Sequence, residues 1–144
     1  MSEQQFRVII TSHDSLCVGY LKAAQLILGV EFPNVSTLPF EASSSMSDFE
    51  DAMRKMVEQK PLRPLLILCD LMGGTPANVA TKFMLINKQI KVVVGVNLPF
   101  ILEILLHQDS GASLLDIPLD DVILSAKNSV IDIRSLMKGC TMND

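Results

Sequence analysis

Residues 65–76 have the sequence LLILCDLMGGTP, and this stretch decides the fold prediction. The run 65–69 is almost wholly apolar and lies between Pro64 and Asp70, which is typical of a short strand buried on both faces. The Gly-Gly-Thr-Pro that follows predicts a turn and then a helix, with Thr75 as N-cap and Pro76 at the first helical position. A buried strand that leads directly into a helix is half of a β-α-β unit.

The same alternation continues on both sides of this unit. Further strands are expected at 6–10, 35–40 and 92–96, and helices at 16–28, 47–60, 76–86, 99–107 and 119–127. Repeated strand–helix alternation favours an α/β fold with a mainly parallel sheet and helices on both faces. Residues 130–133 (VIDI) are a terminal strand candidate without a following helix, which could add at a sheet edge or pair with another chain. Because no internal repeat or long linker is present, one domain is expected over residues 1–144.

Composition excludes several classes of protein. The chain of 144 residues is 49% hydrophobic and 19% charged, so intrinsic disorder is excluded. Its net charge is −4 and it has no dense Lys/Arg cluster, which argues against a nucleic-acid partner. Every apolar run is interrupted before the roughly 18 residues that a membrane span needs, so no membrane insertion is expected.

Cysteine and histidine usage bears on location and metals. Three cysteines without a CxxC pair, together with a polar start (MSEQQ) that lacks the features of a secretory signal, predict a cytoplasmic protein. The two histidines, His13 and His107, are far apart in the sequence, so no zinc site can be assembled from these residues.

Polar residues follow three of the expected strands. Residues 11–15 (TSHDS) follow the first strand, Asp70 and the Gly73-Gly74-Thr75 turn follow the third, and Asn97 follows the fourth. Because ligands of open α/β sheets bind beyond the carboxyl ends of the strands, these residues are expected to converge.

Asp70 could orient the His13 ring if the first and third strands are neighbours, as in the order 2-1-3-4. The glycine turn and the adjacent helix N-terminus would suit an anion, and the Thr75 hydroxyl could donate to it. The sum predicts a histidine that accepts a phosphoryl group. Each part also has a plain structural interpretation: a loop histidine, a capping aspartate, and a turn that only starts a helix.

Three segments carry a family resemblance. Ser12-His13, residues 69–80 (CDLMGGTPANVA) and residues 95–99 (GVNLP) resemble, in the same order and at similar spacing, the IIA domain of the mannose family of the bacterial sugar phosphotransferase system. The resemblance covers roughly residues 6–130, and the D-x-x-G-G-[S/T]-P-x-N segment is its most specific motif.

The resemblance implies both fold and function. It implies a flavodoxin-like domain with sheet order 2-1-3-4 and a terminal strand, here 130–133, exchanged within a homodimer. The phosphocarrier protein HPr would phosphorylate His13 at Nε2, and the IIB component (EIIB) would receive the group. Asp70 would orient the ring, while Thr75, Gly73, Gly74 and Ser12 would lie around the phosphoryl group. No metal or other cofactor is implied, and the sugar is not identified.

Two points qualify the match. Many members follow the histidine with Gly, whereas this chain has Asp14, whose charge would repel a phosphoryl group. A docking rim of apolar residues is expected around His13, with Leu71, Met72 and Phe100 as candidates. The alternative function is a non-catalytic regulatory α/β domain that binds a small anionic ligand, in its sharpest form a receiver domain with Asp70 as its phosphorylated residue. A receiver would need an acidic pair after the first strand and a lysine after a fifth parallel strand, and the sequence pattern offers neither.

Overall fold

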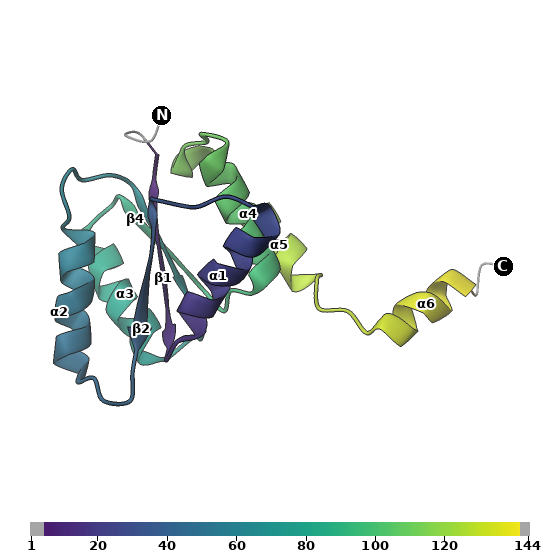
Figure 1. Ribbon diagram of the computed structural model, residues 1–144, viewed down its shortest axis with the longest axis horizontal. Helices are drawn as coiled ribbons and strands as arrows, with labels where there is room; N and C mark the ends of the chain where they lie inside the picture. The colour runs from purple at the N-terminus through teal and green to yellow at the C-terminus, as the bar shows by residue number, and fades with distance from the viewer. Residues whose placement is uncertain (1–4, 142–144) are drawn as a thin grey trace.

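The computed structural model describes residues 5–141, which form a parallel four-stranded sheet with helices on both faces, followed by a projecting C-terminal helix (Figure 1). The sheet order is β2-β1-β3-β4, as predicted. The strands are β1 (Arg7–His13), β2 (Val35–Phe40), β3 (Leu65–Cys69) and β4 (Ile90–Val94). The helices are α1 (Leu16–Leu28), α2 (Met46–Val57), α3 (Thr75–Ile86), α4 (Leu98–Asp109), α5 (Leu119–Lys127) and α6 (Ile133–Thr141), with a 3-10 turn, η2, at Leu114–Asp116.

Strand register brings the predicted site residues to one edge. In the β1–β3 pair Thr11 lies opposite Cys69, so the residues that follow each of them lie side by side at the carboxyl edge of the pair. In the β1–β2 pair His13 lies opposite Phe40. His13 and Asp70, 57 positions apart in the chain, therefore meet at the carboxyl edge of the two central strands.

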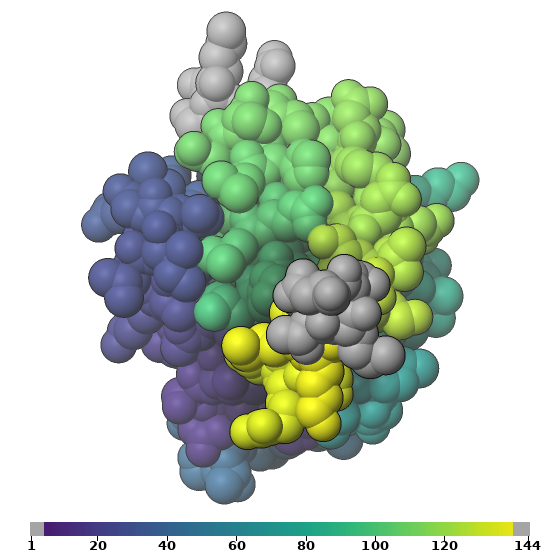
Figure 2. All heavy atoms as spheres, turned by 90° about the vertical axis from the view of Figure 1, so that its right-hand side faces the viewer, coloured from purple at the N-terminus to yellow at the C-terminus, as the bar shows by residue number. Residues whose placement is uncertain are grey.

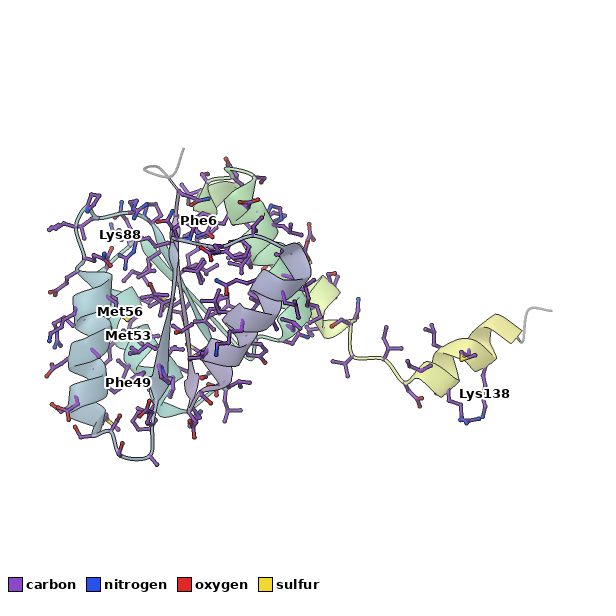
Figure 3. All side chains as sticks on the ribbon, viewed as in Figure 1. Phe6, Phe49, Met53, Met56, Lys88 and Lys138 are labelled. Atoms are coloured by element: carbon purple, nitrogen blue, oxygen red, sulfur yellow. The ribbon has the colours of Figure 1, made fainter. Side chains whose placement is uncertain are left out.

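Each face of the sheet has its own apolar core. One core joins Ile10 and Leu68 to buried residues of α1, α4 and α5, among them Phe100 and Val122. The other joins Ile9 and Ile67 to α2 and α3. Figure 3 labels Phe49, Met53 and Met56 along α2: the first two belong to this second core, and partly buried Met56 packs against it. Because β1 and β3 are covered on both sides, their edge is held rigidly, and the site residues extend from it.

Most predicted elements are present, with shifted ends. The strand expected at 6–10 continues to His13, because polar Thr11 and Ser12 remain hydrogen-bonded and fully buried. The second helix begins at Met46, with Ser45 as the N-cap that accepts from the Asp48 N–H, rather than at residue 47. The N-cap of α3 is Gly74 in extended conformation, so the prediction of Thr75 as N-cap is wrong. The fourth strand lies at Ile90–Val94 instead of 92–96.

The prediction of a strand at 130–133 is wrong. Residues 130–132 have no regular secondary structure, and Ile133 begins α6. Asp132 causes the change: its carboxylate accepts hydrogen bonds from the Arg134 and Ser135 backbone N–H groups and from the Ser135 hydroxyl, as an N-cap residue does. Figure 1 shows α6 beyond α5 and away from both layers, and Figure 2 views the molecule from that side.

Two expectations reach beyond the described part of the chain. Residues 1–4, which belong to the polar start used to predict location, lie outside the described residues, as does the side chain of Cys140. Within residues 5–141, no helix is long and apolar enough to cross a membrane.

Candidate functional site

His13 and Asp70 form the centre of the candidate site. Asp70 Oδ2 lies 3.0 Å from Nδ1 of the His13 ring and accepts a second hydrogen bond, 2.9 Å long, from the His13 backbone N–H. The same oxygen therefore holds both the ring and the strand end that carries it. With Nδ1 directed at a carboxylate, the tautomer protonated at Nδ1 is favoured, which leaves a lone pair on Nε2.

The two side chains differ in exposure. The His13 side chain is 46% exposed, whereas that of Asp70 is 12% exposed. The second carboxylate oxygen, Oδ1, is buried and has no hydrogen-bond partner within residues 5–141. A buried carboxylate loses its hydration and relies on neighbouring groups to offset that cost. A positive charge that develops on the His13 ring therefore stabilises the charge of Asp70.

The loop after β1 is held in an unusual backbone conformation. Asp14 has φ +52°, in the left-handed region that glycine adopts freely and aspartate adopts at modest cost. Its N–H donates to the Phe40 carbonyl, and its carboxylate accepts from the Ser15 N–H. Glycine would adopt this conformation without cost, a backbone requirement that sequence reasoning, which considered only the charge of Asp14, did not reveal.

Ser12 is hydrogen-bonded within the chain. Its hydroxyl donates to the Asp14 carbonyl and accepts from the Cys17 N–H, and the residue is fully buried. The hydroxyl thus links the loop to the first turn of α1. Ser12 shapes the backbone between His13 and that helix.

The turn after β3 places a helix N-terminus beside the His13 ring. Gly73 has φ +83° and is exposed, and Gly74 lies against the ring. The first turn of α3 presents the N–H groups of Thr75 and Ala77, because the first N–H groups of a helix have no intrahelical acceptor and Pro76 has none to donate. Such a turn favours an anion next to it.

Two of the three residues predicted for the apolar docking rim are exposed. Leu71 and Met72 are 57% and 77% exposed in the turn that follows Asp70. Phe100 is 1% exposed and belongs to the core, so its prediction as a rim residue is wrong: α4 directs it toward the sheet. Asn97 also acts structurally, since its side chain caps α4 by accepting from the Phe100 N–H and donates to Ala126 and Ser129.

Two groups near Asp70, buried Cys69 and half-buried Tyr20, have raised pKa values. Burial, with a smaller contribution from the Asp70 charge, raises the pKa of the Cys69 thiol to about 12. The same two causes, in the same order, raise the pKa of Tyr20, whose hydroxyl donates to the Val96 carbonyl. Neither group is charged near neutral pH, so Asp70 is not opposed by another anion from this side. No group of three His, Cys, Asp or Glu side chains able to hold a metal occurs in the described part of the chain.

The comparisons identify the family. Residues 7–117 match the family EIIA-man, described as the PTS system fructose IIA component.

The chain belongs to this family.

A fructose-specific EIIA component of Bacillus subtilis (strain 168) is 29% identical over 99 residues, which cover 68% of this chain and 67% of that protein.

Solved structures agree with the assignment. The phosphotransferase system component EIIA from Streptococcus agalactiae is 30% identical, with a TM-score of 0.77 over 90% of this chain and 98% of that one. A PTS IIA protein associated with a fucose utilization operon of Streptococcus pneumoniae superimposes with a TM-score of 0.82 at 24% identity, over 92% of this chain and 96% of that one, which shows the common fold.

Membership in EIIA-man gives the chain a phosphotransfer role in sugar uptake. It favours the phosphocarrier hypothesis over the receiver-like alternative. The structure places five of the predicted site residues together at one edge of the sheet: His13, Asp70, Gly73, Gly74 and Thr75. Ser12, the sixth, is buried behind them. Sequence reasoning missed Phe40, whose ring meets the His13 ring edge-on at 6.3 Å between centroids.

Proposed function

We propose that the protein is a phosphohistidine carrier: His13 Nε2 accepts a phosphoryl group from HPr and passes it to an EIIB component. The contact between His13 Nδ1 and Asp70 Oδ2 at 3.0 Å carries this proposal. It occupies one ring nitrogen and leaves the other as a nucleophile on a side chain that is 46% exposed.

The transfer can be written with all bonds accounted for. The Nε2 lone pair of His13 attacks phosphorus, and the bond from phosphorus to the donor's histidine nitrogen breaks, so its electron pair returns to that nitrogen. The His13 ring becomes an N-phosphorylated imidazolium while the proton stays on Nδ1, against Asp70. The carboxylate stabilises this cation. In the second half of the reaction an EIIB nucleophile attacks the same phosphorus, and neutral His13 leaves.

The first turn of α3 would receive the phosphoryl oxygens. The Thr75 and Ala77 N–H groups and the Thr75 hydroxyl supply donors beside the ring, and the helix dipole adds a favourable field. Gly73 and Gly74 allow the backbone to approach. Because the Ser12 hydroxyl is engaged with Asp14 and Cys17, we assign it to positioning the loop rather than to contact with phosphate.

Both partner proteins must reach Nε2 across the same surface. Exposed Leu71 and Met72 lie in the turn that begins at Asp70 and would provide apolar contact for docking. The protein would act in the cytoplasm, where its donor and acceptor meet.

Phosphorylation by purified phospho-HPr tests the proposal. Wild type should give one acid-labile phosphohistidine, which phosphorus NMR should assign to the Nε2 isomer. His13→Gln should keep its melting temperature and incorporate no phosphate. Labelling that persists in His13→Gln but is lost in Asp70→Ala would overturn the carrier hypothesis in favour of an acyl phosphate on Asp70.

We also propose a homodimer joined through the C-terminal segment. A helix of nine residues is marginal by itself, yet α6 stands away from the body with Ile133 and Leu136 exposed. An apolar cavity of about 490 Å³ lies at β4 and the end of α5, lined by residues that include Val93, Ile123 and Val130. It can receive this segment from a second copy. Light scattering should give a dimer for wild type and a monomer for Ile133→Asp/Leu136→Asp; equal masses would refute the arrangement.

A further inference from the structure

Three elements surround the His13 ring. Asp70 at the end of β3 holds Nδ1, and Phe40 at the end of β2 meets the ring edge-on. The third wall is the backbone of Gly74. A Cβ atom at Gly74 would lie 2.5 Å from Cε1 and 3.1 Å from Nε2 of the ring. No side chain can occupy that space while His13 stays where it is.

The two glycines of the turn are required for different reasons. Gly73 has φ +83° and open space around its Cβ position, so its requirement is conformational. Gly74 has φ −80° and ψ 166°, an extended conformation that any residue adopts. Backbone geometry therefore does not explain glycine at position 74. The ring contact does.

We infer that Gly74 is a positioning residue for phosphotransfer: its lack of a side chain lets the His13 ring stand against α3 with Nδ1 on Asp70. This inference rests on the proposed carrier function and deepens it. With alanine at position 74, the ring must move away from the backbone of Gly74, and its exposed side chain can yield toward solvent. The contact with Asp70 Oδ2 then breaks, and Nε2 leaves the N-terminus of α3.

The expected consequence is a loss of rate without a loss of fold. The ring is the far end of an exposed side chain, so it can yield to a new methyl group with little disturbance to the core. Displacement of a reacting atom by about 1 Å can cost on the order of a hundredfold in rate. We therefore expect Gly74→Ala to lower kcat for phosphorylation by about ten- to a hundredfold. KM for phospho-HPr should change little, because Leu71 and Met72 are untouched.

Nitrogen-15 NMR of the His13 ring at pH 8.5, where an ordinary imidazole is neutral, gives a readout independent of activity. Wild type should show widely separated Nδ1 and Nε2 shifts, the signature of one fixed tautomer. In Gly74→Ala the two shifts should approach each other as the tautomers average. Gly19→Ala is the matched control, since its Cβ would meet nothing within 4 Å. Gly73→Ala should lower Tm by a few degrees through backbone strain and yet retain the ring signature.

The experiments distinguish failure of the inference about Gly74 from failure of the carrier function. Ring shifts and kcat in Gly74→Ala equal to those of wild type would overturn the inference. Absence of phosphate on wild-type His13 would overturn the carrier function, and with it the role in phosphotransfer, while the ring shifts would still report whether Gly74 places the ring. If Gly74→Ala folds poorly, His13→Ala/Gly74→Ala distinguishes the causes. If the double variant has the same Tm as His13→Ala, the ring contact is the cause of the poor folding. If Gly74→Ala lowers Tm equally with and without the His13 ring, the ring contact is refuted as the cause.

Discussion

Asp70 Oδ2 accepts hydrogen bonds from two atoms of His13, the backbone nitrogen at 2.9 Å and ring Nδ1 at 3.0 Å. One oxygen thus joins the ends of β1 and β3 and also orients the ring. The orientation of the imidazole is therefore tied to the register of the two central strands, which are covered by apolar cores on both faces. Asp70 therefore contributes in two ways, by placing the ring and by its charge, and substitutions at position 70 can separate the two contributions.

Asp70→Asn should preserve the position of the ring and remove the charge. Its amide oxygen can still accept hydrogen bonds from both His13 donors, so the ring should stay in place. Without the charge the imidazolium is stabilised less, and the rate of phosphorylation should fall about tenfold. Asp70→Ala removes both effects and should cost about a hundredfold or more. Rapid-quench assays with phospho-HPr measure both rates. Equal rates for the two variants would mean that charge, and not placement, is the whole contribution of Asp70.

Asp14 combines a backbone constraint with a charge next to the acceptor. Asp14→Asn keeps a residue that tolerates φ +52° and removes the charge, so stability should stay within about 0.5 kcal/mol and phosphorylation should become faster at low salt. Asp14→Ala should lose roughly 1 kcal/mol, because alanine adopts the left-handed region poorly. Urea denaturation and a salt series check these expectations. If Asp14→Asn is phosphorylated at the wild-type rate in low salt, the charge of Asp14 does not repel the incoming phosphoryl group, and the expectation is wrong.

Leu71 and Met72 test the docking surface. Leu71→Ser/Met72→Ser should raise KM for phospho-HPr several-fold and leave Tm unchanged, since both side chains are largely exposed. Leu26→Ser is the matched control, because Leu26 is 84% exposed near the C-terminal end of α1, away from His13. An equal effect of the control on KM would assign docking to general surface hydrophobicity.

The buried thiols should be unreactive in the folded protein. Burial raises the pKa of both Cys17 and Cys69, the latter to about 12, and a raised pKa lowers the thiolate fraction at every pH below it. In a Cys140→Ser background, Ellman's reagent at pH 8 should modify neither thiol natively and both in denaturant. Rapid native modification of either cysteine would contradict the packing around β1 and β3.

The apolar pattern of the sequence was sufficient for a parallel sheet with helices on both faces, and the strand order was implied by the family resemblance. Residues 65–69 are apolar at every position because both faces of β3 are covered, and such a run predicts a central strand without knowledge of its neighbours. The helix 16–28 was predicted with the observed bounds, and Gly29 at φ +71° ends it as expected. The convergence of His13 and Asp70 followed from the strand order that the resemblance implies and from the rule that parallel strands end at a common edge.

Boundaries and the C-terminal segment could not be predicted in the same way. Thr11 and Ser12 are polar yet lie in a strand, since partners distant in the chain or in the next helix satisfy their hydroxyls. Residues 130–133 alternate enough to suggest a strand, but Asp132 caps the helix that begins after it. Phe100 was assigned to the rim because sequence proximity to a site says nothing about which way a helix turns its side chains.

The sequence by itself therefore determined the α/β fold through its hydrophobic periodicity, and its family resemblance supplied the strand order and the set of residues expected at the carboxyl edge. Only the tertiary structure decided which contacts each of those residues makes and therefore which role it has in the site. The double contact of Asp70, the left-handed backbone at Asp14, the engaged hydroxyl of Ser12 and the close approach of Gly74 are distances and angles between separate segments. Such relations arise only when strands and helices pack, and no local pattern encodes them.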